Sequence, residues 1–387
     1  MHILVIPSGY PTEDAPIRGI FFKEQAMALK KDSYNVGVIY SETRRITKVN
    51  VENLKNFHFQ ITDKVEDGVN TIRLKGWNIL MMRNFLGINL WIRQTVGLFD
   101  KYIKKYGKPD IIHVHCGLYG GGAAKIIKEK YGIPYVITEH SSQVLNRKLD
   151  KFHENLLREA YKNADSLISV GEKLKKSMEF YTDNNIKVIP NIVNTDRFFV
   201  KNKENNDKFR FLSISNLIKS KNVNLTIEAF SKNFKGNERF ELHIVGEGSE
   251  KDNLINLAKE LGVFNQVKFY GRVDRENLPD LIQSCDCFVL PSEFETFGVV
   301  YIEALACGLP VIATKCGGPE DVVSHDLGYM IEVNDTYALE EVMKKAPNEI
   351  SKFNKEEMSN YIKNKFSEKV VIDQITELFL NIIKKDK

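Results

Sequence analysis

The sequence predicts an α/β protein built from two doubly wound domains, and three observations support this. Short runs of β-branched and aliphatic residues alternate with amphipathic segments along the whole chain. The runs are continuously apolar, which is typical of parallel strands buried on both faces. The polar stretch "KNKENNDK" (201–208) contains no apolar residue, and the alternation restarts after it. We therefore expect two domains of similar size, joined near residues 190–208.

The first half of the chain contains six expected strands and three expected helices. The strands are "HILVIPS" (2–8), "NVGVIYS" (35–41), "DIIHVHC" (110–116), "PYVITEH" (134–140), "SLISV" (166–170) and "KVIPNIV" (187–193). The helices span 19–31, 121–132 and 151–164. In the third helix, Phe152, Leu156 and Ala160 recur at helical spacing and define one apolar face.

The second half repeats the pattern. Its expected strands are "FRFLSIS" (209–215), "FELHIVGEG" (240–248), "QVKFYGRV" (266–273), "CFVLPS" (287–292), "PVIATK" (310–315) and "GYMIEV" (328–333). Helices are expected at 224–234, 253–262 and 337–346, and the amphipathic segment 370–385 needs a surface to cover. We expect one domain at 1–195 and a second at 196–366, with 367–387 packing back on the first.

Composition excludes several classes of protein. The net charge is +4, with 55 basic against 51 acidic residues, so we expect no nucleic-acid partner. Five cysteines without a C-x-x-C pair predict no zinc site, and the odd count fits a reducing compartment. The N-terminus turns polar too early for a signal peptide, and no apolar run reaches the roughly 18 residues that span a bilayer. We therefore expect a cytoplasmic protein.

The stretch "CFVLPSEFETFGVVYIEALACGLPVIA" (287–313) carries three carboxylates in an otherwise apolar or small run. A buried strand is followed by the polar loop "EFET" and then by a helix that opens near Gly298. Unpaired N–H groups and the helix dipole make such an end attractive to phosphate. Gly298 has no side chain, so an anion can approach its backbone closely.

Glu295 and Glu303 can serve the same ligand. Glu295 lies just before the helix, and Glu303 follows eight residues later, an offset that returns to roughly the same side. Carboxylates accept hydrogen bonds from pairs of sugar hydroxyls, so one glutamate could hold a transferred sugar and the other a ribose. This pattern indicates a nucleotide-sugar site. The alternative is a capping carboxylate and a second glutamate whose head reaches solvent.

The segment "EFETFGVVYIEALACGLPVIA" resembles the E-x7-E signature of the family 4 glycosyltransferases, which are retaining enzymes of the GT-B fold. Further segments agree with that family and follow in its order: "YPTEDAPIRGIFFKEQAMAL", "IPNIVNTDRF", "HIVGEG", "VKFYGRV" and "KCGGPEDVV". The resemblance covers nearly all of the chain, although 43–108 carries none of these motifs. It implies two Rossmann-like domains that face each other across a cleft, the first binding the acceptor and the second the nucleotide-sugar donor.

The resemblance also implies roles for individual residues. Glu295, His140 and Lys221 correspond to residues that act on the reacting sugar and on the donor diphosphate. The implied donor-binding residues are Gly19, Asn216, Lys221, Arg272, Val273, Phe297, Gly298, Val299 and Glu303. A lysine suits its place because the leaving diphosphate gains negative charge as the glycosidic bond breaks.

One position departs from the family pattern. Many relatives carry an arginine five residues before the lysine, where this chain has Asn216. Either Lys219 or Arg18 takes over that charge, or the diphosphate is held less strongly.

Neither a metal nor a cofactor is expected. No two aspartates stand two residues apart, which argues against the other major glycosyltransferase fold and its metal dependence. His113 and His115 end a strand, and we interpret them as core histidines or, with less support, as part of a metal pair. The segment "GLYGGG" (117–122) lacks the G-x-G-x-x-G spacing of a dinucleotide site.

The predicted activity is transfer of a sugar, of the hexosyltransferase type, from a UDP- or GDP-sugar to a saccharide or lipid-linked acceptor in cell-surface polysaccharide synthesis. The segment 77–108 mixes large apolar residues with six basic ones, so it either packs as an ordinary amphipathic helix or contacts the inner face of the membrane peripherally. The alternative functions are a nucleotide-sugar 2-epimerase of the same fold and a non-catalytic sugar-nucleotide binder.

Overall fold

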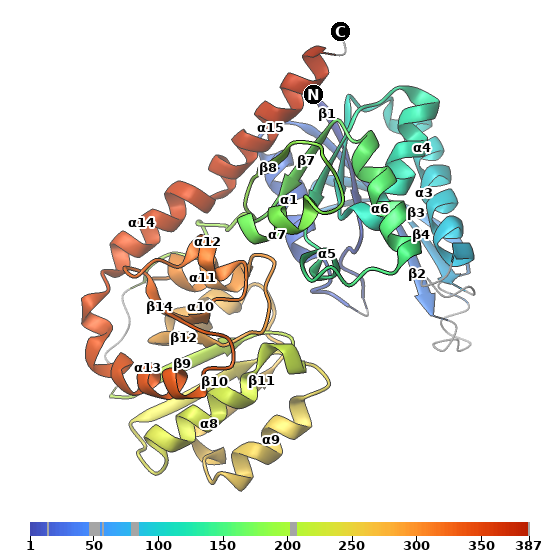
Figure 1. Cartoon of the computed structure of the whole chain (residues 1–387). Coiled ribbons are helices and arrows are strands. Elements are labelled where there is room, and N and C mark those ends of the chain that lie inside the picture. The colour runs from blue at the N-terminus through green and yellow to red at the C-terminus, as the bar shows by residue number, and fades with distance from the viewer. Residues whose placement is uncertain (14, 46–54, 56–57, 79–84, 202–206, 386–387) are drawn as a thin grey trace. The chain divides into compact units, whose positions relative to one another are not determined.

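The computed structural model describes the chain except residues 14, 46–54, 56–57, 79–84, 202–206 and 386–387. The described residues form two compact units (Figure 1). Unit 1 comprises Met1–Pro190 and Val371–Lys387, and unit 2 comprises Asn191–Val370. Each unit has a mainly parallel sheet with helices packed against it, so the prediction of two doubly wound α/β domains is confirmed.

In unit 1 the described residues build an eight-stranded sheet with the order β3-β4-β2-β1-β5-β6-β7-β8. The strands are β1 (His2–Pro7), β2 (Asn35–Arg45), β3 (Gln60–Glu66), β4 (Val69–Asn78), β5 (Ile111–His115), β6 (Tyr135–Glu139), β7 (Ser166–Ser169) and β8 (Ile186–Val188). Both neighbours of β1 run parallel to it, and the chain order reverses between β1 and β5. The central strands are almost completely buried, which explains their continuous apolar runs.

Helices of unit 1 pack by their apolar faces. They are α1 (Ile20–Lys31), α3 (Phe85–Tyr106), α4 (Gly122–Tyr131), α5 (Ser142–Leu145), α6 (Lys151–Asn163) and α7 (Glu172–Met178). In α6, Asp150 caps the N-terminus, and Leu157, Ala160 and Tyr161 are buried. The long helix α15 (Glu368–Lys385) starts in unit 2 and continues in unit 1.

The β3–β4 hairpin is an element that the sequence analysis did not predict. Its two strands pair antiparallel, with Glu66 opposite Val69. The connecting residues Asp67 and Gly68 both have positive φ, 47° and 82°, as a type I′ turn requires. β3 is a polar, mostly exposed edge strand, and in β4 polar residues such as Thr71 and Arg73 interrupt the apolar positions. Neither strand has the continuous apolar run by which the other strands were found. The Asp-Gly pair was the available signal.

The described residues of unit 2 form a six-stranded, all-parallel sheet with the order β11-β10-β9-β12-β13-β14. Its strands are β9 (Phe209–Ile214), β10 (Phe240–Val245), β11 (Val267–Gly271), β12 (Cys287–Leu290), β13 (Val311–Thr314) and β14 (Gly328–Ile331). Its helices are α8 (Val223–Phe234), α9 (Lys251–Glu260), α10 (Leu278–Gln283), α11 (Val299–Ala306), α12 (Pro319–Val322), α13 (Thr336–Glu349) and α14 (Lys355–Phe366). The chain order reverses between β9 and β12.

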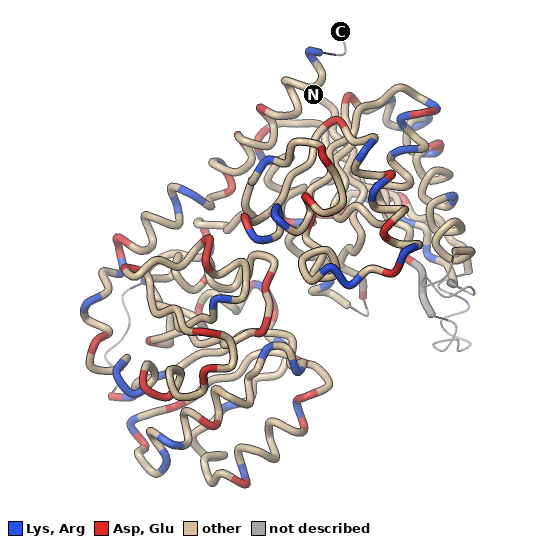
Figure 2. Tube along the Cα trace, in the orientation of Figure 1, with Lys and Arg blue, Asp and Glu red and all other residues tan. Residues whose placement is uncertain are grey.

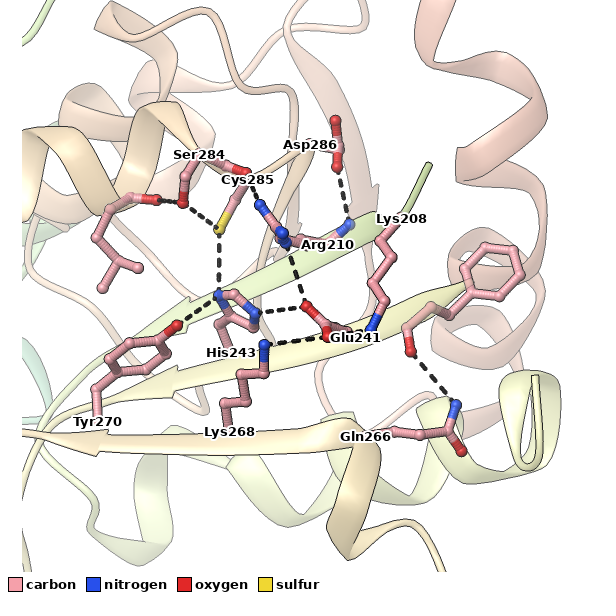
Figure 3. Close-up of polar contacts among 12 residues, drawn as sticks. Lys208, Arg210, Glu241, His243, Gln266, Lys268, Tyr270, Ser284, Cys285 and Asp286 are labelled. Carbon is pink, nitrogen blue, oxygen red and sulfur yellow. Dashed lines mark hydrogen bonds and ion pairs between the residues drawn. The ribbon is translucent and has the colours of Figure 1, made fainter. Parts of the chain in front are cut away.

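A charged network lies on one face of β9, β10 and β11 (Figure 3). At its centre is Glu241, a carboxylate only 5% exposed. Lys208 Nζ, Lys268 Nζ and Arg210 Nε approach its oxygens at 2.8, 3.0 and 3.2 Å, respectively. His243 Nε2 lies 3.3 Å from the same carboxylate. Burial alone would raise the pKa of Glu241, but the hydrogen bonds from Lys208, Lys268 and His243 outweigh it and lower the pKa well below its ordinary value.

Charged residues of both signs are interspersed along the trace of each unit (Figure 2). Among the helices of the described residues, none combines the length and the apolar character needed to cross a membrane.

Candidate active site

Most predicted site residues of unit 2 lie on loops that follow β9, β11 and β12, and Val299 and Glu303 lie in α11. Lys221 ends a 3₁₀ turn (Lys219–Lys221) after β9, and Glu295 stands in the loop after β12. These two strands are neighbours on either side of the point where the chain order reverses. The loops are joined directly, because Glu293 N donates to Ser220 O at 2.8 Å. In open parallel sheets, ligands bind outside the carboxyl ends of the strands at such a reversal point.

Lys221 and Glu295 form an ion pair at this point. Lys221 Nζ lies 2.6 Å from Glu295 Oε1, and the two side chains are only 16% and 13% exposed. The hydroxyl of Ser292, which is fully buried, donates to the same oxygen at 3.0 Å. A charge-assisted contact in a half-buried setting fixes both side chains more firmly than a surface ion pair would. Ser292 was not among the predicted residues.

Two glycines contact the backbone of the loop that carries Glu295. Glu295 forms a β-bridge with Gly317, and Gly318 N donates to Glu295 O at 2.8 Å. A Cβ atom at Gly318 would lie 2.2 Å from Phe297 Cα, so only glycine permits this approach. The "KCGGPEDVV" segment belongs to the family resemblance, but neither of its glycines was a predicted site residue.

The helix α11 begins at Val299, and Gly298 precedes it with φ 85° and ψ 69° in the left-handed region. No side chain caps this end, and the first turn contains no acidic residue. Phe297 is buried, whereas Gly298 and Val299 remain partly exposed. The end of the helix therefore has N–H groups available to an anion. Glu295 lies before the helix, so the helical period does not determine its position. Its position is determined by the contacts with Lys221 and Gly317.

Glu303 is completely buried in α11 and pairs with Arg275. The Arg275 guanidinium reaches Glu303 Oε1 from the loop after β11, and its Cζ lies 5.1 Å from the centre of the Phe198 ring. A buried carboxylate needs such a partner. Arg275 stands three residues after Arg272, but nothing in the spacing indicated that it would reach α11.

The remaining predicted donor residues of unit 2 surround this group of loops. Asn216, Lys219 and Arg272 are exposed, and Val273 is partly exposed. The loop that contains Asn216 is fixed by its neighbour, because Leu217 N donates to Glu247 O at 3.0 Å.

In unit 1, Gly19 stands directly before α1 with φ 65° and ψ 26°. A Cβ atom there would lie 2.3 Å from Gly9 O, so glycine is required by the unit's own backbone. The adjacent Arg18 is exposed. The loop after β1 and the start of α1 are thus tightly connected.

His140 follows β6 and lies at the carboxyl edge of the unit 1 sheet. Its Nε2 is 3.2 Å from His115 Nδ1. The buried Glu139 accepts hydrogen bonds from the backbone N–H groups of His140 and Ser141 at 3.0 and 2.9 Å. Burial, with a smaller contribution from His113, lowers the pKa of His140 to about 3, so its imidazole is neutral at physiological pH.

His113 lies on the same strand as His115, and its Nε2 is 2.7 Å from Thr138 Oγ1. Burial lowers the pKa of His113 to about 3. Within the described ranges of the chain, no group of three or more His, Cys, Asp or Glu side chains is arranged to hold a metal ion.

A cavity of about 480 Å³ lies elsewhere in unit 2, among residues of the segments 324–329 and 349–361. None of the predicted site residues lines it. The candidate site is therefore defined by its chemistry and its place in the topology.

Two family models match the chain and together span residues 19–365. Residues 19–197 match the model described as "Glycosyltransferase Family 4", and residues 194–365 match "Glycosyl transferases group 1". The chain belongs to the family 4 glycosyltransferases. It is therefore a sugar-transferring enzyme.

Curated relatives of this glycosyltransferase share about a quarter of its residues. N-acetyl-alpha-D-glucosaminyl L-malate synthase of Bacillus anthracis is 28% identical, over 72% of this chain and 76% of the relative. The putative teichuronic acid biosynthesis glycosyltransferase TuaC of Bacillus subtilis is 26% identical, over 89% and 88%.

Solved structures of low identity share the fold. Sucrose-phosphate synthase from Thermosynechococcus elongatus has a TM-score of 0.81 at 18% identity and covers 100% of both chains. Anabaena Alr3699/HepE in complex with UDP and glucose has a TM-score of 0.73 at 17% identity, over 98% and 100%. The glycosyltransferase has the GT-B fold, as predicted.

Proposed function

We propose that this glycosyltransferase moves a sugar from a nucleotide-sugar donor to an acceptor hydroxyl with retention of the anomeric configuration. The observation that carries the proposal is the Lys221–Glu295 ion pair, placed where the strand order of unit 2 reverses. Beside it lies the helix end at Gly298, which attracts anions. A cation, a helix N-terminus and a carboxylate acceptor are the groups that a sugar diphosphate needs.

In this proposal the donor diphosphate binds at the start of α11 and beside Lys221. An ammonium group has three N–H donors, so Lys221 can keep its contact with Glu295 and still reach a phosphate oxygen. As the glycosidic bond breaks, negative charge grows on the leaving diphosphate, and the fixed N–H donors stabilise it. Glu295 accepts hydrogen bonds from hydroxyls of the transferred sugar.

Retention is assigned to attack of the acceptor on the same face from which the diphosphate leaves. The departing phosphate oxygen takes the proton of the acceptor hydroxyl as the new glycosidic bond forms. This assignment is part of the proposal and is supported by the resemblance to a family of retaining enzymes.

The other predicted residues complete the proposed donor site. Glu303 binds the ribose, and the backbone at Arg272 and Val273 holds the base. Gly19 and Asn216 lie near the diphosphate, and Phe297 and Val299 present N–H groups to sugar and phosphate. His140 contacts the reacting sugar. The Arg275–Glu303 pair fixes the position of this carboxylate.

We further propose a role in cell-surface polysaccharide synthesis, with a UDP- or GDP-sugar as donor and a saccharide or lipid-linked acceptor. The name of the Bacillus subtilis relative points to teichuronic acid. Another relative, 25% identical over 65% of this chain, is named alpha-monoglucosyldiacylglycerol synthase. Peripheral contact of unit 1 with the inner face of the membrane would suit a lipid-linked acceptor.

The proposal is tested with Glu295→Gln and Lys221→Ala. Each should lower kcat by roughly 10²- to 10³-fold, as loss of a charge-stabilising group does elsewhere. The matched controls are Glu293→Gln and Lys259→Ala, and both should retain activity. Glu293 is an exposed carboxylate in the same loop, and Lys259 is an exposed lysine on α9. A thermal-shift screen with UDP-, GDP- and ADP-sugars first identifies the donor.

Product analysis completes the test. The anomeric configuration of the product, read by NMR, should match that of the donor sugar. A donor-only reaction that releases a free epimer would favour the epimerase, and donor binding without any turnover would favour a non-catalytic binder. Full activity of both Glu295→Gln and Lys221→Ala would refute the site assignment.

A further inference from the structure

A packed row of rings lies at the carboxyl ends of β5 and β6 in unit 1. His115 is only 1% exposed, and its Nδ1 faces His140 Nε2 at 3.2 Å. This inference rests on the proposed contact of His140 with the reacting sugar, and it concerns the group that prepares His140 for that contact.

Aromatic packing fixes the orientation of the His115 ring. The Phe22 ring from α1 stacks on it at 4.5 Å with an interplanar angle of 25°. The His113 ring lies at 4.3 Å on the same strand. Phe22 also packs edge-on against His140, with the ring centres 4.9 Å apart. With neighbours on these sides, His115 is held with Nδ1 toward His140.

The contact between the two imidazoles needs one proton, and the surroundings decide which ring supplies it. In the first arrangement, His115 Nδ1–H donates and His140 carries its own proton on Nδ1. In the second, His140 Nε2–H donates, and the proton of His115 must sit on its Nε2. That atom is buried and has no hydrogen-bond partner among the residues that the structure describes.

The two arrangements differ in where the remaining N–H is left. A buried N–H without an acceptor is costly, and such groups are rare. In the second arrangement it would lie at His115 Nε2, deep in the sheet. In the first it lies at His140 Nδ1, an atom that is also buried but belongs to a partly exposed residue at the strand end, where the proposed sugar contact would supply an acceptor. That atom likewise has no partner within the described part of the chain, so a ligand oxygen can become its acceptor.

We propose that His115 is a positioning residue that donates its Nδ1–H to His140 Nε2 and so holds His140 as the Nδ1–H tautomer. His140 then acts on the sugar as a hydrogen-bond donor to a neutral oxygen and not as a general base. Glu139 supports this placement, because it holds the backbone N–H groups on both sides of the His140 Cα.

The first test reads the tautomer directly. Long-range ¹H–¹⁵N NMR of ¹⁵N-histidine-labelled protein should show the His140 proton on Nδ1, with the signal assigned by its loss in His140→Gln. His115→Asn keeps an amide donor near the position of Nδ1 and should preserve this pattern. His115→Leu removes the donor and should give mixed tautomers. His153→Gln, which changes a histidine of α6 outside this row of rings, should leave His140 unchanged.

The second test separates positioning from folding. In His115→Leu, kcat should fall by roughly tenfold, the value of one lost hydrogen bond, and His115→Asn should recover most of it. Calorimetric affinities for UDP and GDP should not change in either variant, which also shows that unit 2 is folded. A wild-type His140 protonated on Nε2, or an unchanged tautomer in His115→Leu, would overturn the inference even if the leucine variant is unstable.

The outcome for the proposed function is read separately. If His140→Gln keeps full activity, the assignment of His140 to the sugar fails whatever the tautomer. If His140→Gln is inactive but the tautomer is the opposite one, only the role of His115 fails.

Discussion

At the scale of single residues, the charged groups of the candidate site are held by partners from other loops. Lys221 and Glu295 are 74 residues apart in the chain and meet at 2.6 Å. The sequence indicated Glu295 by its place in the polar loop before α11, and it indicated Lys221 only through the family resemblance. It could not indicate Ser292, Arg275 or Gly318, since their roles depend on which loops touch.

Arg275 is the first of these residues that mutation can test. Arg275→Met should destabilise unit 2 by about 3–5 kcal/mol, because it leaves the buried Glu303 carboxylate without its counter-charge. Chemical denaturation measures the change. The double variant Arg275→Met with Glu303→Gln should regain part of the loss, and an additive result would show that the two side chains do not depend on each other.

Replacement of Gly318 by alanine should lower activity for a steric reason. Gly318→Ala places a Cβ 2.2 Å from Phe297 Cα and must displace the loop that carries Glu295. We expect kcat/KM to fall at least about tenfold, as for other displacements of positioned groups. Gly97→Ala is the control, since a Cβ there meets no atom within 4 Å and alanine favours the helix. Equal activity of the two variants would contradict the proposed role of the loop.

At the scale of elements, the apolar period found most of the buried strands and most helices, but it missed both strands of the β3–β4 hairpin. The β9–β12 neighbourhood could be expected from doubly wound topology, whereas β3 could not, because its side chains face solvent and carry no apolar run. The charged network on β9, β10 and β11 was also missed. Its residues are scattered between 208 and 286, and only the strand order brings them together.

That network predicts how stability depends on pH. The pKa of Glu241 is lower in the folded chain than its ordinary value of 4.5, so the folded state binds fewer protons there than the unfolded state. The stability that Glu241 contributes is therefore complete above pH 4.5 and is lost as the pH falls further. Glu241→Gln should unfold more readily at pH 7 and lose less stability between pH 5 and pH 3 than the wild type. Parallel pH profiles in denaturation would contradict this.

At the scale of the whole molecule, α15 belongs to both units. Its buried side chains in unit 1 include Val371, Ile375 and Phe379, and the Phe379 ring lies 5.2 Å from that of His113. The sequence showed an amphipathic helix that needed a surface. The apolar pattern alone did not identify that surface. It indicates which side of the helix is buried, but not which element the helix packs against.

Phe379→Ala should therefore weaken unit 1 by about 3–5 kcal/mol, the usual cost of removing a buried aromatic ring. In calorimetry, the unfolding transition of unit 1 should move to lower temperature. The transition that a bound donor nucleotide raises, assigned to unit 2, should stay in place. Leu380→Ala, on the exposed side of the same helix, is the control. A shift of both transitions by equal amounts would mean that the units unfold together.

The division of α15 between the two units also affects the order in which they can fold during synthesis at the ribosome. Residues 1–190 leave the exit tunnel long before residues 371–385, yet both are parts of unit 1. Until the helix emerges, the surface that it covers stays open to chaperones and to other nascent chains. Unit 2 ends at residue 370 and has its described strands and core by then. It can therefore complete its folding before unit 1 does.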